Sequence, residues 1–304
     1  MTPRKHMVAV GAICTTAIFR VPHIDPPPAK ILATQRCEVV DGMAISAACA
    51  FQKLGGQSHV WARVGDDPQA DVMRHALSAE GLDTQGLFTV KGSRSSHASV
   101  IVDGLGQRLV VPFHDPAVDP SPDWLPLDTL DHMDLLHCDV RWVDGARAAL
   151  QAARARGIPT MVDGDVAPRA VLQQLMPLAD YAVFSDAGIL AYTGLTDVQE
   201  AVRQVAQQHS RHVGASCGAD GYYWIEEGHI QHVPAPHVEV VDTLSAGDVF
   251  HGAFALAILE GQDTRSAARF ACAAASLKCT QFGGRLGCPT RAAVEALIEQ
   301  TYQA

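Results

Sequence analysis

The 304-residue sequence has no long apolar run of the kind that spans a membrane. The apolar run that follows Arg4 and Lys5 extends only from Met7 to Ile13, whereas a spanning helix needs about 20 residues, and no small-residue cleavage site follows it. Internal repeats and low-complexity tracts are also missing, which argues against a solenoid or a disordered chain. We therefore expect a globular, cytoplasmic protein.

Metal-binding and disulfide patterns are absent too. The eight cysteines form no CxxC pair, and the fourteen histidines show no HxxxH or His/Cys spacing typical of zinc sites. Most cysteines lie within apolar segments, so we expect buried free thiols. Acidic residues outnumber basic ones by 33 to 23, which argues against a nucleic-acid partner or an anionic membrane surface. An anionic ligand must then be held by a local arrangement of groups.

The two commonest nucleotide-binding loops are likewise missing. No GxxxxGK[ST] loop occurs, and Gly104-x-Gly106 precedes no helical segment, as a dinucleotide fingerprint would require. Any nucleotide site must therefore use a different turn.

The sequence does contain a regular alternation of apolar runs and helical segments. Because such alternation implies crossover connections, it predicts a mainly parallel sheet covered on both faces. The predicted strands are 8–13, 58–65, 135–138, 160–162, 181–184 and 212–215, and the predicted helices are 44–54, 70–80, 145–156, 168–177, 197–209, 246–260, 263–281 and 290–302.

Two stretches interrupt this alternation: 29–39, and 98–113 with a turn at Asp103-Gly104. They predict a small β lid inserted into the large domain. Ligands of open α/β sheets bind beyond the carboxyl ends of the strands, so the lid should close over that edge. The predicted division assigns 1–13, 43–91 and 115–304 to a large α/β domain, and 14–42 and 92–114 to the lid.

The segment 240–250 carries the chemistry. It reads as a strand that passes through a small-residue turn into a strong helix. Small residues let a ligand approach the backbone, and the first N–H groups of a helix have no internal partner, so an anion can bind there. Asp248 in the first turn also fits an ordinary acidic helix start. On this segment alone, both interpretations stay open.

Asp242-Thr243-Leu244-Ser245-Ala246-Gly247-Asp248 resembles the Asp-Thr-x-Gly-Ala-Gly-Asp signature of the ribokinase-like (PfkB) carbohydrate kinases, with Ser245 in place of the first Gly. The resemblance implies a three-layer α/β/α fold with a β lid. It covers nearly the whole chain, through further matches at Gly11, Gly42, Leu54-Gly55, Val64-Gly65-Asp66-Asp67, Gly106-x-Arg108 and Gly283-Gly284.

By this resemblance, Asp248 would be the general base that activates a sugar hydroxyl. The amides of Ala246, Gly247 and Asp248, in the turn that begins at Ser245, would bind the charge that develops on the transferring phosphoryl group of ATP. Mg²⁺ would be held mainly by the nucleotide phosphates and water. By analogy with the family, K⁺ would bind carbonyls near Asp242, Leu244 and the loop 279–288.

The same resemblance implies a nucleotide site built from three regions of the chain. These are the position of the family's Asn-x-x-Glu element, the turn 216–221, and the segment 275–284 with Thr243. The expected nucleotide-binding residues are Ser185, Ser216, Gly218, Gly221, Thr243, Gly247, Cys279 and Gly283.

Departures from the family pattern occur on the substrate side. Thr16 stands where typical members have a substrate-binding Asp, Asp41-Gly42 replaces two glycines, and Ser46 replaces an Asn. Ser185-Asp186-Ala187-Gly188 replaces Asn-x-x-Glu. We assign Thr16, Gly42 and Ser46 to the sugar site, with contacts that differ from those of an ordinary ribokinase or fructokinase.

Within the family, the sequence is most similar to the 6-deoxy-6-sulfofructose kinases, through Asp139-Val140-Arg141-Trp142, Val162-Asp163-Gly164-Asp165, Asp248-Val249-Phe250-His251-Gly252 and Leu277-Lys278-Cys279-Thr280. This similarity implies an anionic ketose held by Arg141 and Lys30. A third polar position of that group, an Asn, is Pro112 here.

Other interpretations of these residues remain. Arg141 would equally fit an ion pair with Asp139 or Asp144, Lys30 a solvated lid residue, and His251 a packed core residue.

Other functions also fit the sequence. The substrate could be a phosphosugar, a keto-deoxy sugar acid, fructose or ribose, or the chain could be a catalytically weak sugar- or nucleotide-binding protein. A nucleoside is disfavoured because the lid has no evident aromatic clamp for a base. Because the lid strands would otherwise expose an edge, we expect a homodimer that pairs through the lid.

Overall fold

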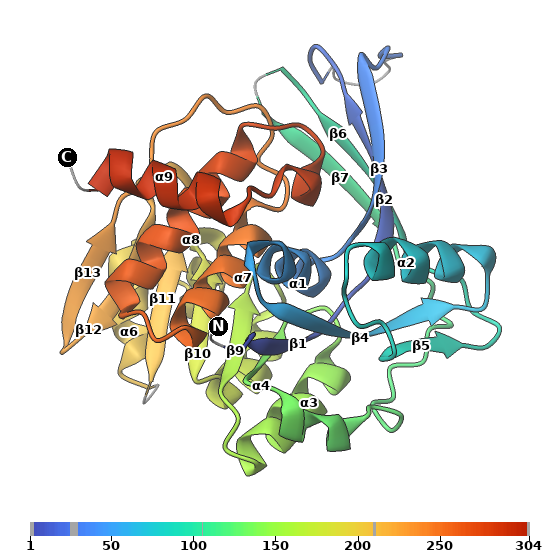
Figure 1. Cartoon of the computed structure of the whole chain (residues 1–304), viewed down its shortest axis with the longest axis horizontal. Coiled ribbons are helices and arrows are strands. Elements are labelled where there is room, and N and C mark those ends of the chain that lie inside the picture. Colours follow the sequence, from blue (N-terminus) through green and yellow to red (C-terminus); the bar gives the residue numbers. More distant parts are fainter. Residues whose placement is uncertain (1–2, 25–29, 105, 209–210, 303–304) are drawn as a thin grey trace.

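The computed structural model describes residues 3–24, 30–104, 106–208 and 211–302. Its centre is a nine-stranded sheet (Figure 1). All pairs from β11 to β5 are parallel, and only β12 and β13 add antiparallel strands at one edge. In spatial order the strands are β13 (His229–Val233), β12 (Tyr222–Glu226), β11 (His212–Ser216), β10 (Tyr181–Ser185), β9 (Thr160–Gly164), β8 (Leu135–Cys138), β1 (His6–Val10), β4 (Gln57–Gly65) and β5 (Leu87–Val90).

Helices cover both faces of this sheet, and β1 shows why. Met7 and Ala9 point into one apolar core and Val8 and Val10 into the other, so the strand is buried on both faces. The first core is closed by α1 (Met43–Leu54), α2 (Pro68–Ala79), α7 (Ala246–Leu259), α8 (Thr264–Cys279) and α9 (Arg291–Tyr302). The second is closed by α3 (Val143–Ala155), α4 (Arg169–Leu175), α5 (Asp186–Thr193) and α6 (Val198–Ala206). The predicted three-layer fold is confirmed.

A separate four-stranded sheet projects from the body at the top of Figure 1, in the order β3-β2-β6-β7. β2 was not predicted as a strand, and part of the expected first lid segment, at Ala29, lies outside the described residues. The strands are β2 (Cys14–Arg20), β3 (Gln35–Asp41), β6 (His97–Val102) and β7 (Arg108–Phe113).

One face of this small sheet looks toward the body. Ile18 and Val100 are cross-strand neighbours, and they pack with Leu244 from the turn before α7. Thr16 lies two residues before Ile18 on the same strand and therefore shares this face. The small sheet is thus held directly over the start of α7.

The structure corrects the predicted strand at 240–241. The described chain forms no strand between 234 and 245. Instead, the amides of Val241 and Asp242 donate to the carbonyl of Cys279, at 2.8 and 3.1 Å. These donors are satisfied by the end of α8, so the segment crosses the sheet edge without joining the sheet.

The sequence predicted that no segment spans a membrane. None of the described helices combines the length and the apolar character needed to cross a bilayer.

Candidate active site

Asp248 lies in the first turn of α7, where the backbone is exposed to a ligand. The amides of Gly247 and Asp248 have no acceptor within the described chain, whereas Ala246 N donates to Thr243 O at 3.3 Å. A Cβ at Gly247 would have no neighbour within 4 Å. Two of the three expected amides are therefore free to bind an anion, and Ala246, in this structure, is not.

Ser245 precedes this turn with a φ of 61°. This left-handed conformation favours glycine and strains other residues. A glycine at this position, as in the family signature, would adopt this backbone conformation without strain. Ser245 adopts it with some conformational strain.

Several carboxylates lie around Asp248. Burial raises the pKa of Asp248 well above its usual range, and the charges of Asp163, Asp41, Asp165 and Asp139 raise it further. Burial also raises the pKa of Asp163 to about 6, while His251 opposes that shift. A carboxylate in such surroundings has a higher affinity for a proton than a solvated one, which suits a general base.

Asp41 was not among the predicted site residues, yet it connects two of them. The hydroxyl of Ser46 donates to its Oδ1, and the Ser245 hydroxyl lies 3.5 Å from the same oxygen. Asp41 is 7 % exposed, and its second oxygen has no partner among the described residues. Three separate departures from the family pattern thus form one hydrogen-bonded unit, which joins the end of β3, α1 and the turn before α7.

The remaining substrate-side predictions lie close to this unit. Thr16 is buried, with its hydroxyl 3.3 Å from Cys14 Sγ. Gly42 has a φ of 130°, and a Cβ there would collide with the carbonyl of Ala12. Ser46 is fully buried, and its hydroxyl donates a hydrogen bond to Asp41. Gly42 therefore shapes the tight connection between β3 and α1.

Arg141 follows β8 at the carboxyl edge of the sheet, but its partner is neither of the predicted ones. Its guanidinium pairs with Asp165 at 2.8 Å and donates to Val166 O at 2.9 Å. Asp139 is occupied by backbone amides, that of Arg141 included, and Asp144 pairs with Arg147. The sequence could not predict this partner, because Asp165 is on the neighbouring strand's loop.

Lys30, the second predicted cation, is exposed. It makes no hydrogen bond or ion pair within the described parts of the chain, which fits a solvated side chain.

The expected monovalent-cation site contains a cation of the protein itself. Lys278 Nζ donates to the Asp242 carbonyl at 2.6 Å and lies 3.6 Å from its carboxylate. That carboxylate also accepts from the amides of Leu244, Gly283 and Gly284. Burial lowers the pKa of the fully buried Lys278, and Asp242 opposes this shift. A lysine in the mostly apolar second half of α8, between Leu277 and Cys279, was the sequence signal for this pair.

The predicted nucleotide residues fall on neighbouring elements. Ser185 and Ser216 are direct register partners at the ends of β10 and β11. Ser185 also caps α5 and donates to Asp165 at 3.1 Å. A Cβ at Gly221 would collide with Val233 O, whereas Gly218 is unobstructed. The hydroxyl and carbonyl oxygens of Thr243 both accept from Arg108.

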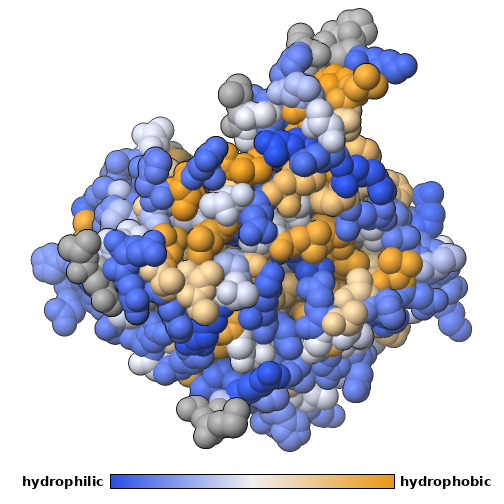
Figure 2. All heavy atoms as spheres, turned by 45° about the horizontal axis from the view of Figure 1, so that its top comes forward, coloured by the Kyte–Doolittle hydropathy of each residue, from blue (hydrophilic) through white to orange (hydrophobic). Residues whose placement is uncertain are grey.

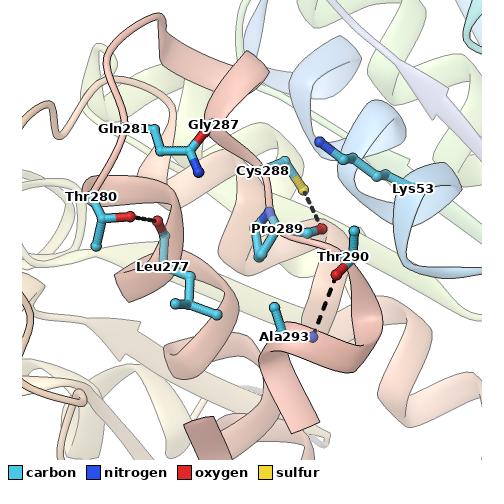
Figure 3. A pocket seen from close by; sticks show the side chains of 9 residues that line it. All are labelled: Lys53, Leu277, Thr280, Gln281, Gly287, Cys288, Pro289, Thr290 and Ala293. Carbon is cyan, nitrogen blue, oxygen red and sulfur yellow. Dashed lines mark hydrogen bonds between the residues drawn. The ribbon is translucent and has the colours of Figure 1, made fainter. Parts of the chain in front are cut away.

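A pocket of about 280 Å³ lies beside the 279–288 segment (Figure 3). In Figure 3, Lys53 reaches into it from α1, opposite Cys288. It contains none of the carboxylates around Asp248. Its lining residues are Lys53, Leu277, Thr280, Gln281, Gly287, Cys288, Pro289, Thr290 and Ala293.

Comparison with known proteins places this geometry in a family. Residues 4–291 match the model of the pfkB family carbohydrate kinases. A solved structure of a candidate ribokinase from Agrobacterium tumefaciens is similar, with a TM-score of 0.96 and 37 % identity over 99 % of this chain and 100 % of that one.

Curated relatives are more distant in sequence but nearly as complete in coverage. The ribokinase of Bacillus subtilis is 28 % identical, over 88 % of this chain and 90 % of its own length. The fructokinase of Vibrio alginolyticus is 25 % identical, over 85 % of this chain and 91 % of its own length. With the family model spanning nearly the whole sequence, the chain belongs to the pfkB family of carbohydrate kinases.

Proposed function

We propose that this kinase transfers the γ-phosphoryl group of ATP to a sugar hydroxyl, with Asp248 as general base. The observation that carries the proposal is the position of Asp248, a half-buried carboxyl with a raised pKa beside two free helix amides. Asp248 would accept the hydroxyl proton, while the amides of Gly247 and Asp248 stabilise the charge on the transferring group. Bound Mg²⁺ would neutralise phosphate charge.

The proposed nucleotide site follows the edge from the α7 turn to the ends of β10 and β11. Ser185, Ser216 and Thr243 offer hydroxyl groups there, and the turns at Gly218 and Gly221 let the backbone approach a phosphate. Cys279 and Gly283 would flank the nucleoside. The free amides of the turn fit an anion without a basic side chain.

For the substrate we propose an anionic ketose such as 6-deoxy-6-sulfofructose. Arg141 supports this, because its pair with Asp165 is exposed, at 40 % and 36 % of the two side chains. Exposed pairs are worth only about 0–1 kcal/mol, so a sulfonate or phosphate could share or replace Asp165. Lys30, free in the lid, would add a second charge. Thr16, Gly42 and Ser46, with Asp41, would surround the attacked hydroxyl.

A neutral sugar is the second candidate, because curated relatives are named ribokinase and fructokinase. Coupled measurement of ADP release over neutral, sulfonated, phosphorylated and carboxylated sugars tests both. The anionic proposal fails if ribose or fructose gives the highest kcat/KM.

We propose that Lys278 supplies the charge expected from a monovalent cation. Turnover of the wild type should then be equal in potassium chloride and in tetramethylammonium chloride at the same ionic strength.

Removing Lys278 leaves the buried Asp242 carboxylate without its counter-charge. Breaking such a buried pair lowers the free energy of unfolding by about 3–5 kcal/mol. In Lys278→Ser, K⁺ should therefore raise both the thermal stability and the turnover. The exposed Lys53→Ser serves as the control. A wild type that requires K⁺ would contradict the proposal.

We propose that the small sheet is a lid and that two lids pair in a homodimer. Leu109, Val111 and Phe113 alternate along the edge strand β7, and they are 48, 56 and 43 % exposed. Figure 2 shows hydrophobic atoms on the projecting lid. An apolar edge strand of this kind is normally covered.

Scattering-derived mass at micromolar concentration should therefore correspond to a dimer. Val111→Glu should yield monomers because it buries a charge in the interface, whereas Val72→Glu, at an equally exposed valine on α2, should remain dimeric. A fully active wild-type monomer would refute lid pairing.

A further inference from the structure

His251 is a buried polar residue within the apolar helix α7. It is 2 % exposed, and its flanking residues Phe250 and Gly252 are also buried. It lies three residues after Asp248, and side chains at this spacing are neighbours on one helix face, with Cβ atoms about 5–6 Å apart. His251 therefore lies on the same face of α7 as the proposed base, one turn further along the helix.

Both ring nitrogens of His251 face groups that can only accept a hydrogen bond. Nδ1 lies 2.7 Å from the carbonyl oxygen of Gly247, and Nε2 lies 3.2 Å from that of Val183. A neutral imidazole has one N–H and one lone pair, so one nitrogen would direct its lone pair at a carbonyl oxygen. With a proton on each nitrogen, both contacts become hydrogen bonds.

A counter-charge for the protonated ring is present. Asp163 Oδ2 lies 3.6 Å from Nδ1, and both side chains are almost fully buried. The other ring nearby is His137 on β8, whose centroid is 5.7 Å away. Burial lowers the pKa of His137 to about 3, so His137 stays neutral. Asp163 is thus placed to balance a positive charge on His251.

The surroundings of Asp248 are rich in carboxylates. The charged groups that raise its pKa come from three directions: Asp41 at the end of β3, Asp139 after β8, and Asp163 and Asp165 at β9. The Cys14 thiol also lies nearby, but burial raises its pKa to about 12, so it carries no charge. Arg141 is already paired with Asp165.

We propose that His251 is held as an imidazolium ion and that its charge, paired with Asp163, keeps Asp248 able to ionise among the surrounding carboxylates. His251 is then a positioning residue for the charge of the base and does not touch the substrate. This inference rests on the proposed role of Asp248 as general base.

The pH dependence of kcat/KM tests this role. His251→Asn keeps one donor for Gly247 O but removes the charge, so the acidic limb of the profile should move to higher pH by about 1 unit, as expected for loss of a nearby opposite charge. The matched control is His137→Asn, which changes a buried but neutral neighbour and should leave the limb in place. If the acidic limb of the kcat/KM profile lies at the same pH in the wild type and in His251→Asn, the proposal is overturned.

A second measurement does not depend on activity. In protein with ¹⁵N-labelled histidine, assigned through backbone correlations, both ring nitrogens of His251 should carry protons at pH 7. A deprotonated ring nitrogen at that pH would also overturn the proposal, even if the variant fails to fold.

The activity of Asp248→Asn separates the two proposals. If this variant remains fully active, the proposed base is wrong, and only the protonation of the ring nitrogens then tests the charge of His251. If Asp248→Asn is inactive and the limb does not move, only the role of His251 fails.

Discussion

Replacement of Asp248 by Asn is expected to lower kcat by about 10²- to 10⁴-fold, the range for loss of a positioned proton acceptor. The amide has nearly the same shape but cannot take the proton from the sugar hydroxyl. The free amides of Gly247 and Asp248 belong to the backbone, so the affinity for ATP should stay near that of the wild type. Turnover and calorimetric ATP binding measure the two effects. A variant with more than half of the wild-type turnover would remove Asp248 from its proposed role.

The same substitution should stabilise the fold. The pKa of Asp248 is raised in the folded state, so ionisation of Asp248 costs stability as the pH rises from its unfolded value near 3.8 to the folded value. Asn removes that cost. The melting temperature should therefore rise in Asp248→Asn by a few degrees at pH 8, and the gain should vanish near pH 4. The exposed Asp123→Asn provides a control.

A gain that is independent of pH would show that the charge of Asp248 is not the cause. Loss of stability at pH 8 would indicate that the carboxylate is instead held by favourable contacts. Either result would distinguish the effect of Asp248 on the stability of the fold from its proposed effect on turnover.

Replacement of Arg141 by Met should separate an anionic from a neutral substrate. The change removes the charged fork and keeps much of the side chain's bulk. For an anionic ketose, the loss of a charge-assisted contact is expected to cost about 2–5 kcal/mol, or roughly 30- to 5,000-fold in kcat/KM. Fructose has no group for Arg141 to hold, so its kcat/KM should change little. The ratio of the two values is the quantity to measure, because it cancels general damage.

A suitable control is Arg147→Met, which removes another exposed arginine with a carboxylate partner, Asp144. If Arg141→Met lowers kcat/KM equally for the anionic and the neutral sugar, the role of Arg141 is structural. It would then act through its ion pair with Asp165, which follows β9. If the wild type does not prefer anionic sugars, the departures at Thr16 and Ser46 define a different sugar site. In that case only the family-level function remains.

Local patterns predicted the strands and helices that are buried on both faces or strongly periodic. The run 135–138 coincides with β8, and the helix predicted at 290–302 corresponds to α9. β2 was missed because it belongs to the small sheet, where its neighbours β3 and β6 come later in the chain. The false strand at 240–241 has an apolar pair of valines, but its amides bond to the end of α8.

By itself, the sequence determined the family, the layered fold and the turn that presents Asp248, because these depend on local propensity and on an uninterrupted signature. Only the tertiary structure decided which ionisable groups meet: Arg141 with Asp165, Asp242 with Lys278, and His251 with Asp163. It also joined Asp41 to Ser46 and Ser245. Such contacts depend on which strands and helices lie side by side, and spacing along one chain does not specify that order.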